Sequence, residues 1–315
     1  NDLATLEQYR QARREYKEEI KLAKGKGWQK FCTEMNDTSQ MARIQKVIKL
    51  GKREEIGSLK DSQGNYTTTP EDTLKVLLEK HFPDKEDTGN EPDIDTNTGI
   101  DNFNVYESIT LESVRSSIGS FKPYKSPGID GIYPILLQKG IDFLGKYIVE
   151  IYRECILKGK SPARWLETKV VFIPKPGKLA YDEAGAFRPI SLFSFLLKGV
   201  ERIVQWHLDK YSLRDKLHRN IFAYKESTST EDALHNLLHK IEKAMEQKEQ
   251  AIVLFLDLTA AFSTMTVEGI IKNLKNIGCD AKILKWCKHM LEHRIVITFL
   301  VGGQVCKLVV RGTPQ

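Results

Sequence analysis

The sequence has few cysteines and no long apolar run, and each shortage excludes a class of protein. Its five cysteines are scattered, and no two of them form a Cys-x-x-Cys pair. This pattern argues against a disulfide framework and a zinc knuckle, and it favours a reducing compartment. The longest apolar run, residues 251–256, has six residues, whereas a membrane-spanning helix needs about 20. No basic start leads into an apolar stretch, as a secretory signal would require. We therefore expect an intracellular protein, nuclear or cytoplasmic, without a membrane span.

Charge is distributed unevenly along the chain, although the net charge is only +6. Residues 1–60 carry 14 Lys and Arg against 9 Asp and Glu, and residues 111–315 carry 31 against 21. The stretch between them, residues 61–110, carries 3 against 12. Two basic regions separated by an acidic one favour a polyanionic partner such as nucleic acid. The alternative is that the positive charge serves solubility alone.

The first part of the chain, residues 1–82, is predicted to be a basic and mostly helical region. Apolar residues at helical spacing predict a helix over residues 3–31, broken by Lys24-Gly-Lys-Gly-Trp28. Two shorter helices are expected over residues 39–50 and 70–81. Residues 83–103 are rich in Asp, Glu, Asn, Thr, Gly and Pro. They have almost nothing to bury, so we expect an acidic flexible linker.

The remaining residues, 104–315, alternate helical and strand-like segments, which is typical of the α+β class. Residues 168–173 read as a strand, and Gly302-Gly303 lies between two apolar runs as the turn of a hairpin would. Ser229 and Asp232 resemble an N-terminal cap pair. Helices are expected over residues 110–121, 134–158 and 196–208, and near Thr266. A further helix is expected to begin at Ser229. Its expected buried face consists of Leu234, Leu237, Leu238, Ile241 and Met245.

Asp257 ends the apolar run that begins at Ala251, and the run reads as a fully buried strand. A carboxylate at the end of a buried strand is costly unless it is paired, hydrogen-bonded or bound to a metal ion. Strand ends also carry many ligand sites. Asp257 is therefore a candidate functional residue. The alternative is that it caps the following turn or pairs with a lysine.

Several motifs occur in a fixed order and together resemble one family. They are Lys125-Ser-Pro-Gly-Ile-Asp-Gly131, Val171-Phe-Ile-Pro-Lys-Pro-Gly-Lys178, Arg188-Pro-Ile-Ser191, Asn220-Ile-Phe-Ala-Tyr-Lys225, Leu256-Asp-Leu-Thr-Ala-Ala-Phe262 and Arg311-Gly-Thr-Pro-Gln315. Each motif is weak alone, but in this order they resemble the reverse transcriptases of non-LTR (LINE-type) retrotransposons. The resemblance implies that residues 104–315 form the fingers and part of the palm of such an enzyme.

The resemblance also implies an activity and a set of site residues. The enzyme would be an RNA-directed DNA polymerase that binds an RNA template, a DNA primer and dNTPs. Two Mg²⁺ ions would assist phosphoryl transfer, with Asp257 bound to both and the Leu258 carbonyl as a further oxygen ligand.

Four further residues are expected at the incoming nucleotide. Lys175 and Arg188 would clamp its triphosphate, and Gln315 would touch it. Phe262 would lie under its sugar, where the ring leaves no room for a 2′-hydroxyl. The alternatives are that Lys175 and Arg188 are solvated surface charges and that Phe262 is an ordinary core residue.

The sequence also departs from the family pattern. Asn220, Ala223 and Ser263 stand where the family usually has Gln, Gly and Asp, and no Asp-Asp pair occurs anywhere in the chain. We therefore expect a fragment that stops before the paired-aspartate motif and does not polymerise by itself. The alternative function is a non-catalytic or domesticated nucleic-acid-binding remnant. A basic helical interaction protein of another kind would require the ordered motifs to be a coincidence.

Overall fold

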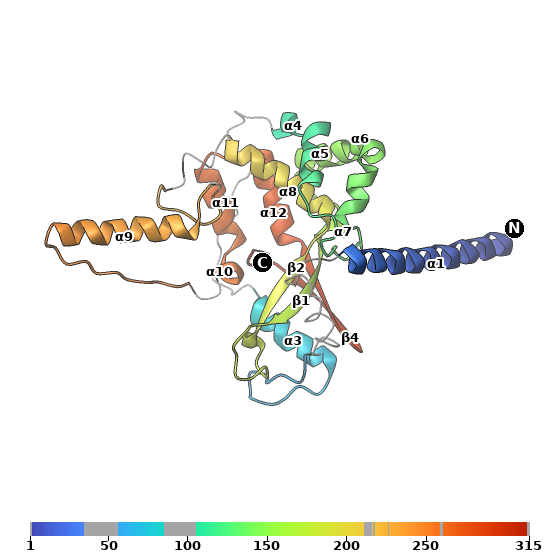
Figure 1. Cartoon of the computed structure of the whole chain (residues 1–315), viewed down its shortest axis with the longest axis horizontal. Coiled ribbons are helices and arrows are strands. Elements are labelled where there is room, and N and C mark those ends of the chain that lie inside the picture. Colours follow the sequence, from blue (N-terminus) through green and yellow to red (C-terminus); the bar gives the residue numbers. More distant parts are fainter. Residues whose placement is uncertain are drawn as a thin grey trace. The chain divides into compact units, whose positions relative to one another are not determined.

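The computed structural model describes residues 2–34, 56–84, 105–210, 216, 218–225, 227–258 and 261–313. They form two compact units, Asn1–Ile56 and Gly57–Gln315 (Figure 1). The second unit combines helices with a mixed four-stranded sheet and is therefore compatible with the predicted α+β class. Its helices are α3 (Pro70–His81), α4 (Val105–Ser108), α5 (Leu111–Gly119), α6 (Pro134–Lys158), α7 (Ala163–Leu166), α8 (Phe195–Leu208), α9 (Thr230–Glu246), α10 (Ala261–Thr264), α11 (Val267–Asn276) and α12 (Ala281–Glu292).

The first unit contains α1 (Asp2–Glu34), which is one continuous helix. The break expected at Lys24-Gly-Lys-Gly-Trp28 is therefore wrong. Gly in a helix interior costs only about 1 kcal/mol relative to Ala, and without a proline nothing forces the helix to end there. The helix expected over residues 39–50 lies outside the described residues.

The sheet has the strand order β2-β1-β3-β4, with β1 (Glu167–Pro174), β2 (Phe187–Leu192), β3 (Arg294–Leu300) and β4 (Gly303–Val309). β1 runs antiparallel to β2 and parallel to β3, and β3 runs antiparallel to β4. The predicted hairpin at Gly302-Gly303 is confirmed. Gly302 has a φ of 87°, a conformation that favours glycine because other residues meet a steric penalty there.

One face of the sheet is buried, with Thr168, Val170 and Phe172 of β1 and Val296 of β3 almost fully covered. α3 packs against β3 and β4. The His81 ring at its end lies 5.6 Å from the Phe172 ring, and Nε2 of His81 is 3.0 Å from the Ala184 carbonyl.

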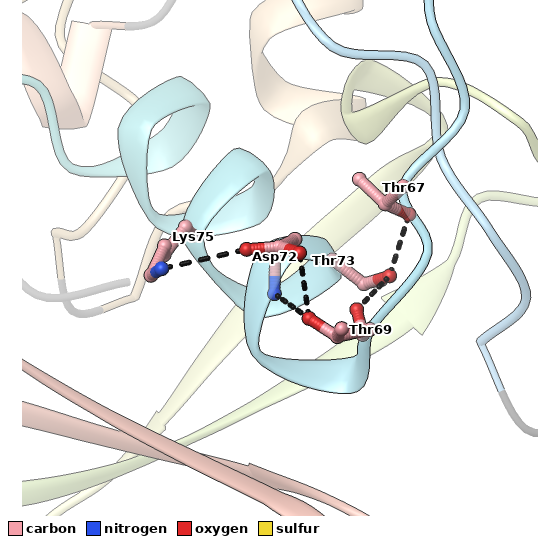
Figure 2. Close-up of polar contacts among 5 residues, drawn as sticks. All are labelled: Thr67, Thr69, Asp72, Thr73 and Lys75. Atoms are coloured by element: carbon pink, nitrogen blue, oxygen red, sulfur yellow. Dashed lines mark hydrogen bonds and ion pairs between the residues drawn. The ribbon is translucent and has the colours of Figure 1, made fainter.

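A chain of hydroxyl groups fixes the start of α3, as Figure 2 shows. The hydroxyl of Thr73 donates to the Thr69 carbonyl at 3.2 Å, so its own oxygen accepts from Thr67 at 2.7 Å. Thr67 in turn accepts the amide of Leu59. Thr69 caps the helix by accepting the Asp72 amide. The segment before α3 and the helix itself are therefore joined through buried hydrogen bonds, which are strong in a low-dielectric interior.

The compact second unit begins at Gly57, whereas residues 57–82 were predicted to belong to the basic N-terminal region. Besides the packing of α3, an ion pair of 2.7 Å joins Lys60 to Asp182, and the Lys60 amide donates to the Asp182 carbonyl. These contacts lie far apart in sequence, so composition could not show them. Residues 85–104, which make up most of the expected linker, lie outside the described residues.

The main hydrophobic core lies among the helices and is centred on Tyr152 of α6, Ile203 of α8, Ile271 of α11 and Trp286 of α12. α6 has the predicted bounds and ends at Gly159. Trp286 donates its ring N–H to Ser161 at 2.8 Å, which satisfies the indole group inside this core.

α9 begins with the predicted cap, because Ser229 and Asp232 form a reciprocal capping box. The predicted burial of its apolar face is wrong. None of the residues of α9 is buried, and Leu234, Leu238 and Met245 are exposed. A helical period in the sequence shows that such a face exists, but not that another element covers it.

Candidate active site

Asp257 lies in an exposed segment, residues 251–258, that forms neither helix nor strand. The expected buried strand is wrong: within the described residues no strand pairs with this segment. Ile252 is 94% exposed and Leu256 is 84% exposed. A strand needs a neighbour for its backbone hydrogen bonds, and β1 to β4 form their sheet without this segment. The carboxylate of Asp257 is therefore solvated, and the argument from the cost of burial does not apply to it.

The segment after Asp257 is bound to the last motif of the chain. The Thr313 amide donates to the Phe262 carbonyl at 2.7 Å, and the Gly312 amide donates to the Met265 carbonyl at 2.8 Å. The guanidinium of Arg311 adds a bond to the Thr264 carbonyl at 3.1 Å. Two motifs about 50 residues apart in sequence are thus joined by their backbones.

Phe262 itself is 41% exposed. The alternative that it is an ordinary core residue is therefore wrong. Its backbone is fixed by Thr313, while part of its ring faces solvent, so a ligand could contact the ring. The side chain of Ser263 and all of Gln315 lie outside the described residues.

Arg294 at the start of β3 holds the backbone of residues 311–312, and it was not among the residues predicted from the sequence. Its side chain is buried, with the residue 3% exposed. It donates to the carbonyls of Arg311 and Gly312, and also to Leu291 at the end of α12. Burial lowers the pKa of Arg294 to about 10, so the group is still charged at neutral pH. A charged residue at the edge of an apolar run was the available sequence signal, and it is a weak one.

Glu201 of α8 is the carboxylate that acts on Arg294 electrostatically. Burial raises the pKa of Glu201 to about 7, and the positive charges of Lys198 and Arg294 act in the opposite direction. The same carboxylate in turn acts to raise the pKa of Arg294. Arg294, which holds residues 311–312, therefore lies in a low-dielectric environment, where the attraction between its charge and Glu201 is stronger than in water.

Lys175 and Arg188 lie on the β1–β2 hairpin. Arg188 is exposed and pairs with Ile173 across the two strands. Lys175 follows β1, and its ammonium group donates to the Gly185 carbonyl at 2.8 Å. No hydrogen bond or ion pair joins either side chain to Asp257 or Phe262 in the described part of the chain. The structure thus brings Lys175 and Arg188 to one hairpin and joins Phe262 to Thr313.

The motif of residues 125–131 packs at Gly128 against the backbone that follows β2. A Cβ atom on this glycine would lie 2.7 Å from the backbone carbon of Phe193 and 2.7 Å from the nitrogen of Ser194. Backbone atoms cannot move aside as a flexible side chain can, so glycine is required for this close approach. The loop of residues 125–131 is thereby fixed beside the end of β2.

The oxygen donors at Asp257 and Leu258 are of the kind that Mg²⁺ prefers, but they are too few for two ions. One carboxylate cannot offset two divalent charges. Among the described residues, no group of three or more His, Cys, Asp or Glu side chains could hold a metal ion. These donors fit part of a two-metal site and not the whole of it.

Comparison with known proteins identifies the class. Residues 173–315 match the family described as reverse transcriptase (RNA-dependent DNA polymerase). These residues therefore belong to the reverse transcriptase family. No helix in the described part of the chain has the length and apolar character of a membrane span.

The relatives are proteins of non-LTR retrotransposons, and two of the three described below are named RNA-directed DNA polymerases. The chain is 26% identical to the Retrovirus-related Pol polyprotein from type-1 retrotransposable element R1 of Bradysia coprophila over 98% of its own length. It is 30% identical to the probable RNA-directed DNA polymerase from transposon BS of Drosophila melanogaster. It is 27% identical to the RNA-directed DNA polymerase from mobile element jockey of Drosophila funebris. Each of these two matches covers 66% of the present chain. The chain spans 30% of the R1 protein and 23% of each of the other two. The predicted family is confirmed.

Proposed function

We propose that this chain supplies the fingers and part of the palm of an RNA-directed DNA polymerase that extends a DNA primer on an RNA template. The observation that carries the proposal is the backbone connection between Phe262 and Thr313. It joins the motif of the expected catalytic aspartate to the motif that ends in Gln315, as a shared nucleotide site requires.

In the complete enzyme, two Mg²⁺ ions would supply Lewis-acid stabilisation of phosphoryl transfer. Asp257 and the carbonyl of Leu258 are the donors this chain offers them. Further carboxylates must come from elsewhere, because the chain has no paired aspartates.

The other expected residues would position the nucleotide. Arg188 is exposed and free to face a triphosphate, to which a guanidinium can donate two parallel bonds. Lys175 would exchange its bond to the Gly185 carbonyl for a stronger one to a charged phosphate oxygen. Arg294 would act as a positioning residue, because it holds the backbone of residues 311–312 that leads to Gln315.

Primer extension tests the proposal. Residues 1–315 alone should not extend a DNA primer on an RNA template, because one carboxylate cannot offset two metal ions. A longer chain that adds the paired-aspartate motif should extend it. Polymerase activity in the 315 residues, or none in any longer chain that folds and binds RNA, would contradict the proposed function.

Sugar selection is a second consequence, tested in the longer active chain. Phe262→Val should admit ribonucleotides while dNTP use stays largely intact, because only the space beside the 2′ position opens. The measurement is the ratio of dNTP to rNTP incorporation. Because Phe262 is partly exposed, folding should be little affected. An unchanged ratio would show that Phe262 does not contact the sugar.

A further inference from the structure

α1 carries six basic residues on one side of the helix. Successive residues of a helix are about 100° apart, so the six fall within an arc of about 100° and along about 21 Å of its axis. All of them are exposed. Glu15, Glu18 and Glu19 lie outside the arc. We call this set the basic stripe; it consists of Arg10, Arg13, Arg14, Lys17, Lys21 and Lys24.

The basic stripe opposes the stability of its own helix. Its members are three or four residues apart, where side chains are neighbours and like charges destabilise a helix by about 0.2–0.5 kcal/mol per pair. Within the described residues, no ion pair neutralises any of the six. The described side chains of α1 also bury almost nothing, since only Ile20 is partly covered. A partner with closely spaced negative charges would remove this repulsion.

The charge pattern favours nucleic acid over other anionic partners. A duplex carries one negative charge per about 1.7 Å of its axis. A duplex segment as long as the basic stripe therefore has more phosphates than the stripe has basic side chains. A helix that lies on a membrane needs a single apolar face. In α1, Tyr16 and the partly covered Ile20 lie about 40° apart around the helix, but the exposed Leu22 lies about 120° from Tyr16 and about 160° from Ile20. These three side chains therefore do not form one apolar face.

We propose that the basic stripe of α1 binds the phosphate backbone of an RNA-containing duplex and forms a nucleic-acid contact outside the matched reverse transcriptase domain. This deepens the proposed function and rests on it for the identity of the partner. The binding itself depends on the charge of α1, which lies outside residues 173–315.

The test measures binding of the whole chain to a short RNA–DNA hybrid over a range of salt concentrations. A stripe variant replaces all six residues with Gln, which has nearly the same helix propensity as Lys and Arg. It should bind at least about 100-fold more weakly at low salt, and the slope of log affinity against log salt should fall by about 5, as six lost phosphate contacts to a duplex predict.

A charge-neutral variant separates the stripe from the net charge. It combines R14Q, E15Q, K17Q, E18Q, E19Q and K21Q, so its net charge is that of the parent while three of the six stripe residues are lost and no new stripe forms. It should bind about 10-fold more weakly than the parent, with a salt slope lower by about 3, whereas K26Q with K30Q, which lie on the other side of α1, should bind nearly as the parent does. Parent-like binding by the charge-neutral variant would overturn the proposal.

Two controls keep the outcome decisive. Circular dichroism of each variant should show the helix content retained, with helix content of the parent rising when the hybrid is added. Tighter binding to vesicles of anionic lipid than to the hybrid would also overturn the proposal. A longer chain that adds the paired-aspartate motif and binds the hybrid through the stripe, but does not extend a primer, would count against the proposed function alone.

Discussion

Replacing Arg294 with Met should lower the free energy of unfolding by about 3 kcal/mol and loosen residues 311–313. The change removes a donor that is shared by the carbonyls of Leu291, Arg311 and Gly312. A buried polar group left without a partner costs about 1–3 kcal/mol, and the methionine cannot donate to any of the three. Denaturant unfolding measures the first effect.

Hydrogen exchange measures the second effect, because the Gly312 and Thr313 amides donate to Met265 and Phe262. Both amides should exchange faster in Arg294→Met. In Arg294→Lys the charge remains, but a single ammonium group cannot replace the forked guanidinium, so an intermediate effect is expected.

Arg115→Met is the matched control. Arg115 forms a 2.8 Å ion pair with Asp142, but both side chains are at least half exposed, and exposed pairs contribute about 0–1 kcal/mol. It should leave stability within that range and leave the two amides unchanged. If Arg294→Met behaves like this control, Arg294 does not anchor residues 311–313.

The elements that the sequence predicts well are those with local physical signals. Proline at the first turn and a threonine cap mark α3, and the glycine after α6 has the left-handed conformation that ends a helix. The turn of the β3–β4 hairpin is marked by Gly302 in the same way. These signals act within a few residues, so a single sequence contains all that is needed to interpret them.

The parts that the sequence misplaces depend on partners far away along the chain. Residues 251–256 are as apolar as a buried strand, but burial requires a neighbouring strand that local composition does not reveal. The apolar face of α9 is exposed for the same reason. Conversely, Arg294 is buried although arginine usually lies on the surface, because three carbonyls from distant segments meet its guanidinium.

The candidate site was predictable in its motifs and not in its connections. The order of motifs indicated Phe262 and Gln315 as parts of one site, and the structure joins their segments through Thr313. The hydrogen bond of Lys175 to Gly185 and the solvated state of Asp257 had no sequence signal. Both follow from the path of the backbone.

In a longer chain that extends primers, Asp257→Asn should abolish the reaction. Asn keeps the size and a hydrogen-bonding oxygen of the side chain, but it removes the charge that offsets divalent ions. The loss should reach several kcal/mol of transition-state stabilisation, which is a fall of about a thousandfold or more in rate.

Measurements of unfolding free energy and RNA affinity should show that the loss of primer extension in Asp257→Asn is not a folding defect. Because Asp257 is exposed, Asp257→Asn should change the free energy of unfolding by no more than about 0.5 kcal/mol, and RNA affinity should be nearly unchanged. Glu249→Gln, which removes an exposed carboxylate eight residues earlier, is the matched control and should keep full activity. An active Asp257→Asn would mean that the carboxylate holding the metal ions lies elsewhere.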